Sequence, residues 1–179
     1  PSSVLISERD DNPSGSVIVA TMEGTRPLLI ELQALTSPSI FGMPRRTANG
    51  IDHNRLTLLV AVLEKKAGLA LGTQDIYLNV VSGIRINEPA VDLGMVLVCA
   101  SSFKNISIDK KTVVIGEVGL TGEVRAVNLI EKRLKEAEKL GFQTCIIPES
   151  NKKLLKESFE LDIIGVKNIN EAMKAVGLK

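Results

Sequence analysis

The segment AVDLGMVLVCASSF, residues 90–103, is almost wholly apolar and is long enough for a helix of several turns. A helix that is apolar on all sides belongs in the middle of a hydrophobic core, because none of its faces favours water. Strand-like segments lie on both sides of it in the sequence. DIYLNVVS at 75–82 alternates in hydropathy, and TVVIGEV at 112–118 is rich in β-branched residues. This part of the chain therefore predicts a buried helix between two strands.

Toward the N-terminus, the sequence predicts a β-hairpin followed by a long loop. GSVIVATME at 15–23 and RPLLIELQALT at 26–36 are rich in aliphatic and β-branched residues, and only Gly24 and Thr25 separate them. The next stretch, SPSIFGMPRRTANGID at 37–52, is polar and contains two prolines and two glycines. It predicts a long loop, and long ordered loops are often functional.

Strands and helices alternate in the rest of the chain. The apolar spacing within 53–67 predicts an amphipathic helix with Asp52 as its N-cap. The segment 128–140 predicts a second amphipathic helix, capped by Asn128. The remaining segments predict a strand at 144–148, a short helix at 150–158, a strand at 161–166 and a last helix at 168–177. Residues 1–179 are therefore expected to form one mixed α/β or α+β domain.

The composition limits the chemistry that this domain can carry. Its 179 residues include 22 Lys and Arg against 21 Asp and Glu, and the net charge of +1 says little about partners. The single histidine, His53, excludes a multi-histidine metal site, and we interpret it as a polar residue that opens a helix. Cys99 and Cys145 lie in apolar stretches and are expected to be buried, reduced thiols. Aromatic residues make up only 3% of the chain, which weighs against single-strand binding through base stacking.

Short motifs of common enzymes are absent from the sequence. It contains no GxxxxGK[ST] phosphate-binding loop, no GxGxxG between a strand and a helix, and no HExxH, CxxC or GxSxG. A Ser–His–Asp triad would have to combine His53 with an unmarked serine. No segment has the ~18 consecutive apolar residues that a membrane-crossing helix needs.

Four long blocks, in order along the chain, carry a much more specific signal than any short motif. They are GSVIVATMEGTRPLLIELQALTSP, PRRTANGIDHNRLTLLVAVLEKKAGL, DIYLNVVSGIRINEPAVDLGMVLVCASSF and GEVGLTGEVRAVNLIEKRLKEAEKLGF. These blocks closely resemble the C-terminal domain of the bacterial RadA (Sms) family of DNA repair and recombination ATPases. The resemblance covers almost the whole chain and weakens after about residue 150.

The resemblance implies a Lon-protease-like fold, also described as ribosomal protein S5 domain 2-like, of the α/β (α+β) class. It also implies a domain that works in the bacterial cytoplasm and assembles into a hexameric ring. Because the chain begins at Pro1 rather than Met, we expect a fragment that lacks upstream zinc-finger and RecA-like ATPase domains. ATP, Mg and Zn would belong to those upstream domains, and no cofactor or metal is expected in this one.

The similarity to Lon raises the question of peptidase activity. Lon-type peptidases use a serine in a G-P-S-A segment and a lysine after a G-x-V-x-P-I-G-G-L-K segment. Here the matching segments are EPAV at 88–91 and GEVRAVNLIEK, which place Ala90 at the serine position and Glu131 at the lysine position. An alanine methyl group cannot act as a nucleophile, and Lys132 cannot substitute because one helical step turns a side chain by ~100°. The resemblance therefore implies an inactive peptidase.

Carboxylates could still gather near the former active site. Glu88, Asp92 and Glu131 are the candidates for such a pair or cluster. Without a nucleophile, a metal or a marked substrate pocket, we expect these residues to be structural. Glu88 and Asp92 lie four residues apart at a predicted helix start, where the helix dipole favours negative charge.

The cationic residues are distributed unevenly. Seven of the eight arginines lie within residues 1–125, mostly at turns and strand ends, whereas nine of the fourteen lysines lie at 132 or beyond. The planar guanidinium group suits phosphate oxygens, so arginines on one side of the domain could follow a nucleic-acid backbone. The candidate DNA-binding residues are Arg26, Arg45, Arg46, Arg55, Arg85 and Arg125. The alternative is that each arginine pairs locally with Glu23, Glu31, Asp52, Glu88 or Glu117.

Three hypotheses follow for the function. The first is a non-catalytic, ring-forming domain of a RadA-type branch-migration protein, which binds single-stranded or branched DNA regardless of sequence and has a recombinase as a further candidate partner. The second is a serine–lysine peptidase of the Lon type, which Ala90 and Glu131 disfavour. The third is an oligomerisation scaffold without DNA contact, and the sequence leaves it open.

Overall fold

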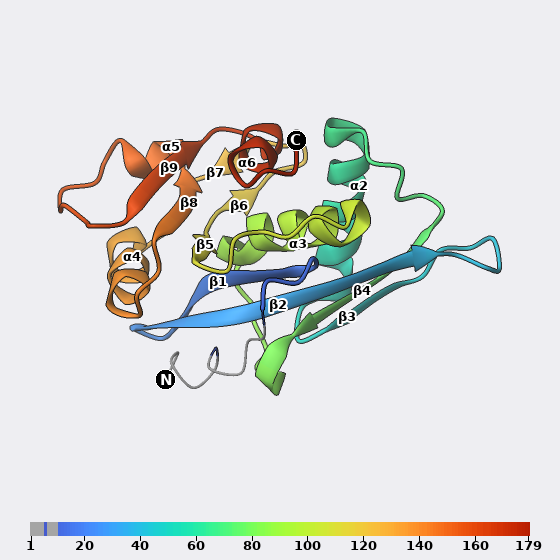
Figure 1. The fold of residues 1–179 in the computed structure, drawn as a ribbon, viewed down its shortest axis with the longest axis horizontal. Helices are drawn as coiled ribbons and strands as arrows, with labels where there is room; N and C mark the ends of the chain where they lie inside the picture. Colours follow the sequence, from blue (N-terminus) through green and yellow to red (C-terminus); the bar gives the residue numbers. More distant parts are fainter. Residues whose placement is uncertain (1–5, 7–10) are drawn as a thin grey trace.

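The computed structural model describes residue 6 and residues 11–179, and it shows a mixed α/β fold built on one long sheet (Figure 1). The strands of this sheet lie in the order β3-β4-β2-β1-β5-β8-β9, and most neighbouring pairs are parallel. Their bounds are β1 (Ser16–Glu23), β2 (Arg26–Pro38), β3 (Arg46–Asn49), β4 (Gln74–Val80), β5 (Thr112–Val114), β8 (Thr144–Pro148) and β9 (Asp162–Val166). A separate two-stranded sheet pairs β6 (Glu117–Val118) with β7 (Val124–Arg125).

Five α-helices and two short 3₁₀ helices complete the described part of the chain. The α-helices are α2 (His53–Ala67), α3 (Asp92–Lys104), α4 (Ile130–Lys139), α5 (Glu149–Lys152) and α6 (Ile169–Ala175). The 3₁₀ helices are η1 (Val81–Gly83) and η2 (Pro89–Val91). None of the helices in residues 11–179 is both long and apolar enough to cross a membrane.

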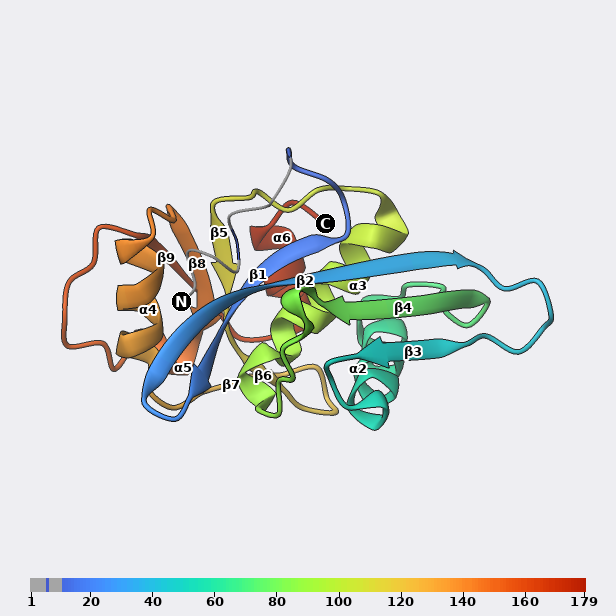
Figure 2. The same cartoon turned by 90° about the horizontal axis from the view of Figure 1, so that it is seen from below.

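The predicted hairpin is present, and it organises the sheet. β1 and β2 pair antiparallel from Ser16↔Gln33 to Glu23↔Arg26, with the turn at Gly24 and Thr25. Gly24 has a φ of +64°, a left-handed conformation that suits glycine. Because β2 is longer than β1, its C-terminal half extends past β1 and pairs antiparallel with β4. The far end of β2 therefore reaches out from the body of the molecule (Figure 2).

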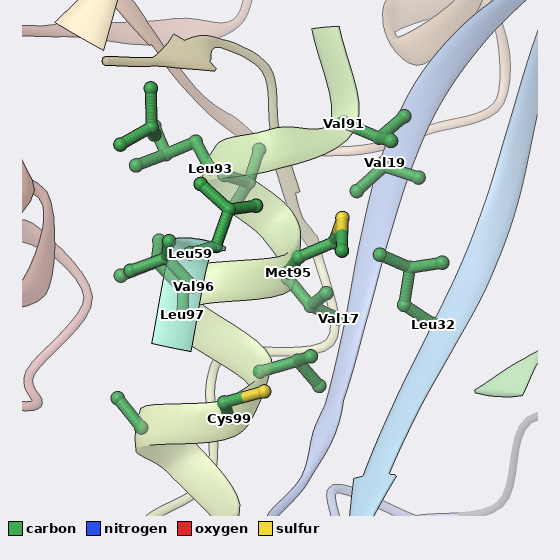
Figure 3. Packing of buried hydrophobic residues seen from close by; sticks show 14 of the residues in the cluster. Val17, Val19, Leu32, Leu59, Val91, Leu93, Met95, Val96, Leu97 and Cys99 are labelled. Atoms are coloured by element: carbon green, nitrogen blue, oxygen red, sulfur yellow. The ribbon is translucent and has the colours of Figure 1, made fainter. Parts of the chain in front are cut away.

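The central helix is buried as its composition predicts. All residues of α3 from Asp92 to Ser101 are buried, and the helix packs along β1 and β2 (Figure 3). Gly94 allows this close packing, because a Cβ atom there would lie 2.2 Å from Cγ1 of Val19. Side chains of β1 alternate between two cores, with Val17 and Val19 toward α3 and Ile18 in the cluster that contains Leu134 of α4.

Three local predictions are wrong. The predicted loop at 37–52 contains a strand, β3, which pairs parallel to β4, so only residues 39–45 and 50–52 lie outside strands and helices. Asn128 does not cap α4, since Leu129 precedes the helix in a left-handed conformation while Asn128 binds a side chain of the same helix. The helix predicted at 150–158 is a single turn, α5.

Other local predictions are confirmed. Asp52 caps α2 by accepting a hydrogen bond from the backbone N–H of Arg55, and His53 begins that helix. Cys99 and Cys145 are free, buried thiols, and burial raises the pKa of each to about 12.

Candidate functional site

The segment around Ala90, which the resemblance to Lon singled out in the sequence, lies where η2 leads into α3, beside the C-terminal end of β1. Ala90 is buried, and its carbonyl oxygen accepts a hydrogen bond from the N–H of Gly116 at 2.9 Å. The N–H of Leu93 donates in turn to the carbonyl of Gly116 at 3.0 Å. These two bonds fix the backbone of the segment against the strand region after β5. The side chain held in this fixed segment at position 90 is a methyl group.

Glu88, two residues before Ala90, accepts hydrogen bonds from three parts of the chain. Its Oε1 accepts from the hydroxyl of Thr21 and the N–H of Met22, both at 2.9 Å, and from Nη1 of Arg133 at 2.5 Å. Its Oε2 accepts from Nη2 of Arg133 at 3.0 Å. Burial opposes ionisation of this carboxyl group, but the hydrogen bonds and charge of Arg133 outweigh it and hold the pKa of Glu88 below its ordinary value.

Arg133 is the residue of this site that the sequence reasoning missed. Its side chain is fully buried and also donates to the carbonyl of Ala20 at 2.8 Å, to the carbonyl of Asn128 at 3.0 Å and to Oδ1 of Asn128 at 2.8 Å. One signal was available in the sequence. Arg133 lies beside Leu134 and four residues before Ala137, on the apolar face of its helix, where an arginine needs partners inside the fold.

Asp92 forms a second buried ion pair at the start of α3. Nε of Arg55 donates to Oδ1 of Asp92 at 3.0 Å, and Nη2 of Arg55 donates to Oδ2. The backbone N–H of Val118 also donates to Oδ2 at 3.0 Å, while the carbonyl of Val118 accepts from Arg55 at 3.0 Å. Desolvation raises the pKa of Asp92, and the bonds from Arg55 and Val118 offset this effect only in part. The pair joins α2, α3 and β6.

Glu131 faces away from these two pairs. Its carboxylate is exposed and accepts hydrogen bonds from the backbone N–H groups of Lys156 and Glu157, both at 3.0 Å, and these bonds lower its pKa. The three carboxylates considered in the sequence therefore do not form one cluster, because each has different partners. Over residue 6 and residues 11–179, no group of three or more His, Cys, Asp and Glu side chains could hold a metal ion.

A cavity of about 320 Å³ lies beside the start of α3. Its walls are apolar at Ile51, Ile86, Pro89, Val91 and Met95, and polar at Asp52, Arg55, Asn87, Glu88 and Asp92. Arg55, Glu88 and Asp92 already form the ion pairs described above. The polar groups of this wall are thus largely committed to partners within the fold.

Three of the six candidate DNA-binding arginines have partners of their own. Arg55 pairs with buried Asp92, and Arg46 donates to the carbonyls of Gln74 and Leu71 and lies 3.8 Å from Glu64. Arg125 is more exposed but lies 3.6 Å from Glu117 and 3.3 Å from Glu123. Arg46 and Arg55 thus have partners inside the fold. These side chains hold strands and helices together, so a structural role is favoured for them.

The other three candidates are exposed. Within the described residues, the side chains of Arg26, Arg45 and Arg85 have no hydrogen-bond or ion-pair partner. Arg45 is the last residue of the loop at 39–45, and Arg9 lies outside the described residues.

Arg26 and Arg85 both lie at the turn between β1 and β2. Arg26 is opposite Glu23 in the strand register, and Arg85 lines a hollow of about 510 Å³ together with Glu23 and Gly24. Lys132 reaches the same turn, since its Nζ lies 3.4 Å from the carbonyl of Thr25. The structure thus brings together two predicted arginines and a lysine.

The fold and this arrangement define a mixed α/β domain in which two buried ion pairs, Arg133–Glu88 and Arg55–Asp92, fix the start of α3. A family model described as Subunit ChlI of Mg-chelatase matches residues 32–151, which is more than half of the chain, and the chain belongs to this family.

Curated relatives carry a more particular name. The chain is 51% identical to DNA repair protein RadA of Halalkalibacterium halodurans, 52% to that of Bacillus subtilis and 48% to that of Listeria monocytogenes, in each case over 97% of the chain. It spans only 38% of the length of each of these relatives. The resemblance to RadA that the four sequence blocks predict is confirmed.

Proposed function

We propose that this chain is a non-catalytic, DNA-binding and assembly-forming module of a RadA-type DNA repair protein, with a Lon-protease-like fold. The names of the relatives support the role in repair. The hairpin, the central helix and the degenerate dyad positions support the proposed kinship with Lon. The chain has no phosphate-binding motif of its own, so ATP with Mg, and Zn, would belong to other parts of the longer protein.

The observation that carries DNA binding is the group of cations at the β1–β2 turn. Arg26, Arg85 and Lys132 lie around one turn, and Glu23 is the carboxylate that faces them there. Glu88, which also lines the hollow, is neutralised by Arg133. Guanidinium groups without partners in the fold can bind phosphate oxygens on any sequence, and such binding weakens with salt through release of counterions.

Fluorescence anisotropy with a labelled single-stranded oligonucleotide and a labelled branched DNA tests this proposal. Arg85→Ala should weaken binding to both, and on the single strand it should lower the salt slope by about 0.7 for the phosphate contact it removes. Arg125→Ala is the matched control, because it removes the same charge from a residue that is 59% exposed but already paired with Glu117 and Glu123. Equal effects of the two variants would contradict a site at the turn.

A second measurement separates this proposal from a scaffold without DNA contact. If the wild-type chain assembles but binds neither DNA at low salt, the scaffold is the correct function. If Arg26→Ala and Arg85→Ala weaken DNA binding while the molar mass by light scattering is unchanged, binding and assembly are separate properties. Whether a recombinase binds this domain is a further proposal, and pull-down of a purified recombinase by the wild-type chain and by the Arg26→Ala variant tests it.

A peptidase is the disfavoured alternative, and the site gives a physical reason. The nucleophile position holds the methyl group of Ala90, and the lysine position holds Glu131, which faces residues 156–157. The buried cationic side chain of this region is Arg133, and a guanidinium group already bound to a carboxylate does not serve as a general base. Casein cleavage that a serine-directed inhibitor blocks would show that the site is active after all.

A further inference from the structure

The loop between β2 and β3 exposes large apolar side chains. We call residues 39–45 the apolar loop, because Ile40 is 84% exposed, Phe41 83% and Met43 84%. Isolated apolar residues on a surface are ordinary, whereas several together on a projecting segment mark an interaction site. Figure 2 shows the loop at the far end of the extended strands β2 and β3, well beyond the body of the domain.

A hollow with an apolar lining, which suits the apolar loop, lies elsewhere on the same chain. It measures about 400 Å³, and Val124, Leu154 and Val166 line it. We call it the β7–β9 hollow, after the strands that carry Val124 and Val166. Leu154 is 77% exposed although its side chain is apolar. Glu149, Ser150, Lys153 and Lys167 complete the lining, so polar groups of both signs surround an apolar centre. An apolar centre with a polar rim is the usual anatomy of a protein–protein interface.

The apolar loop and the β7–β9 hollow lie at opposite ends of the molecule. In Figure 1 the loop lies at the right end of the long axis, while β7, β9 and α5 lie toward the left, and Figure 2 shows the same separation. The two surfaces cannot meet within one molecule. They can meet between two copies arranged head to tail, and such contacts give rings where the rotation between copies closes, or filaments where it does not.

We propose that the apolar loop of one copy docks in the β7–β9 hollow of the next copy. This inference rests on the proposed assembly and names the contact that would produce it. The three exposed side chains present on the order of 500 Å² of mainly apolar surface, judged from the area that large side chains bury. A standard interface takes about 800 Å² from each partner, so the loop tip with its flanking residues can supply most of one side.

A second copy fits these observations better than another kind of partner, because the chain carries both halves of the contact. Two acidic or two basic rims would repel each other. The loop ends in Arg45, whose backbone N–H donates to Asp75, and the hollow has both lysines and a glutamate at its rim. Mixed charges on both surfaces allow them to approach.

Two variants test this proposal, and each disrupts only one of the two surfaces. Phe41→Asp places a charge on the loop tip, and Leu154→Asp places one at the hollow; both side chains are so exposed that neither change affects the core. Light scattering after gel filtration should show that each variant has lost the assembled state of the wild type. Leu58→Glu is the matched control, because Leu58 is an exposed apolar residue on α2, which forms neither surface, and it should assemble as the wild type does.

Mixing the two defective variants gives the decisive result. Phe41→Asp retains an intact hollow and Leu154→Asp retains an intact loop, so one good contact can form between them and growth must stop there. The mixture should therefore give a one-to-one dimer from two monomers.

Three results in light scattering would overturn the inference: a mixture that stays monomeric, a Phe41→Asp variant with wild-type mass, or a wild-type chain that is itself monomeric. Vesicle binding that Phe41→Asp abolishes without any change in mass would also overturn it, in favour of a lipid surface. DNA binding measured on the same samples is independent of these outcomes, so a failure of the contact is distinguishable from a failure of the DNA proposal.

Discussion

The guanidinium group of Arg133 and the carboxylate of Glu88 form a two-point ion pair inside the protein, with Nη1–Oε1 at 2.5 Å and Nη2–Oε2 at 3.0 Å. The pair links α4 to the segment before η2, and Glu88 extends the link to Thr21 and Met22 at the end of β1. Three elements that are distant in the sequence therefore meet at one carboxylate. The polar side chains of this region therefore hold the fold together.

We expect strong coupling between these two residues. Removing one member of a buried ion pair typically costs 3–5 kcal/mol, because the other charge stays buried without its partner. Arg133→Met and Glu88→Gln should each lower the free energy of unfolding. For Arg133→Met the loss should be about 3 kcal/mol, the lower end of this range, because Glu88 keeps its bonds from Thr21 and Met22. The double variant should cost less than the sum by about 1–3 kcal/mol. Urea unfolding of all four proteins measures this coupling, and additive effects would contradict it.

The pH dependence of stability should carry the signature of Glu88. Its pKa in the folded protein is below the ordinary value of 4.5, so its contribution to stability is fully present above that value. The contribution is lost as the pH falls through the lower, folded-state pKa. The difference in urea midpoint between wild type and Glu88→Gln should therefore be large at neutral pH and shrink in acid.

A matched control for this experiment is Glu131→Gln. The pKa of Glu131 is also lowered, but its carboxylate is exposed, so solvent screens its interactions. The wild type and Glu131→Gln should show nearly parallel urea midpoints across the same pH range. If Glu131→Gln changes the acid slope as much as Glu88→Gln does, the special role of the buried pair is wrong.

The close approach of α3 to β1 should make Gly94 intolerant of a side chain. Its backbone does not have a positive φ, so the cost of Gly94→Ala comes from space alone, since the new Cβ would lie 2.2 Å from Val19 Cγ1. We expect destabilisation of about 1–3 kcal/mol from overpacking. Gly72→Ala is the control, because Gly72 also lacks a positive φ and its Cβ would meet only a Glu64 oxygen at 3.5 Å. Thermal unfolding should show a lower midpoint for Gly94→Ala alone.

Much of this fold was predictable because local patterns were strong. The hairpin, the buried helix α3 and the Asp52 cap follow from hydropathy and from side-chain chemistry within a few residues. The strand β3 was not predictable in this way. Its four residues, RTAN, have no strand pattern of their own, and the strand exists because β4 offers it a free edge.

The site shows the same limit of local reasoning. The degenerate positions Ala90 and Glu131 can be found by comparing short segments. The pairing of Glu88 with Arg133, or of Arg55 with Asp92, joins residues 45 and 37 positions apart and depends on how the helices dock on the sheet. For the same reason, the sequence could not separate Arg46 and Arg55, which are committed to partners, from Arg26 and Arg85, which are exposed.

Restoring the missing serine should not restore a peptidase. Ala90→Ser would place a hydroxyl in a buried position, at a cost of about 1–3 kcal/mol if it finds no partner, and no base would be near enough to activate it. Adding Glu131→Lys should not help, because the side chain at 131 lies against the backbone of residues 156–157 rather than toward position 90. Incubation with a fluorescent serine-directed phosphonate should leave both variants unlabelled, and casein should remain intact. Labelling of the double variant but not of Ala90→Ser alone would mean that α4 can turn position 131 toward the former nucleophile. In that case the two missing side chains would be the main barrier to catalysis, and the arrangement around Arg133 would be a minor one.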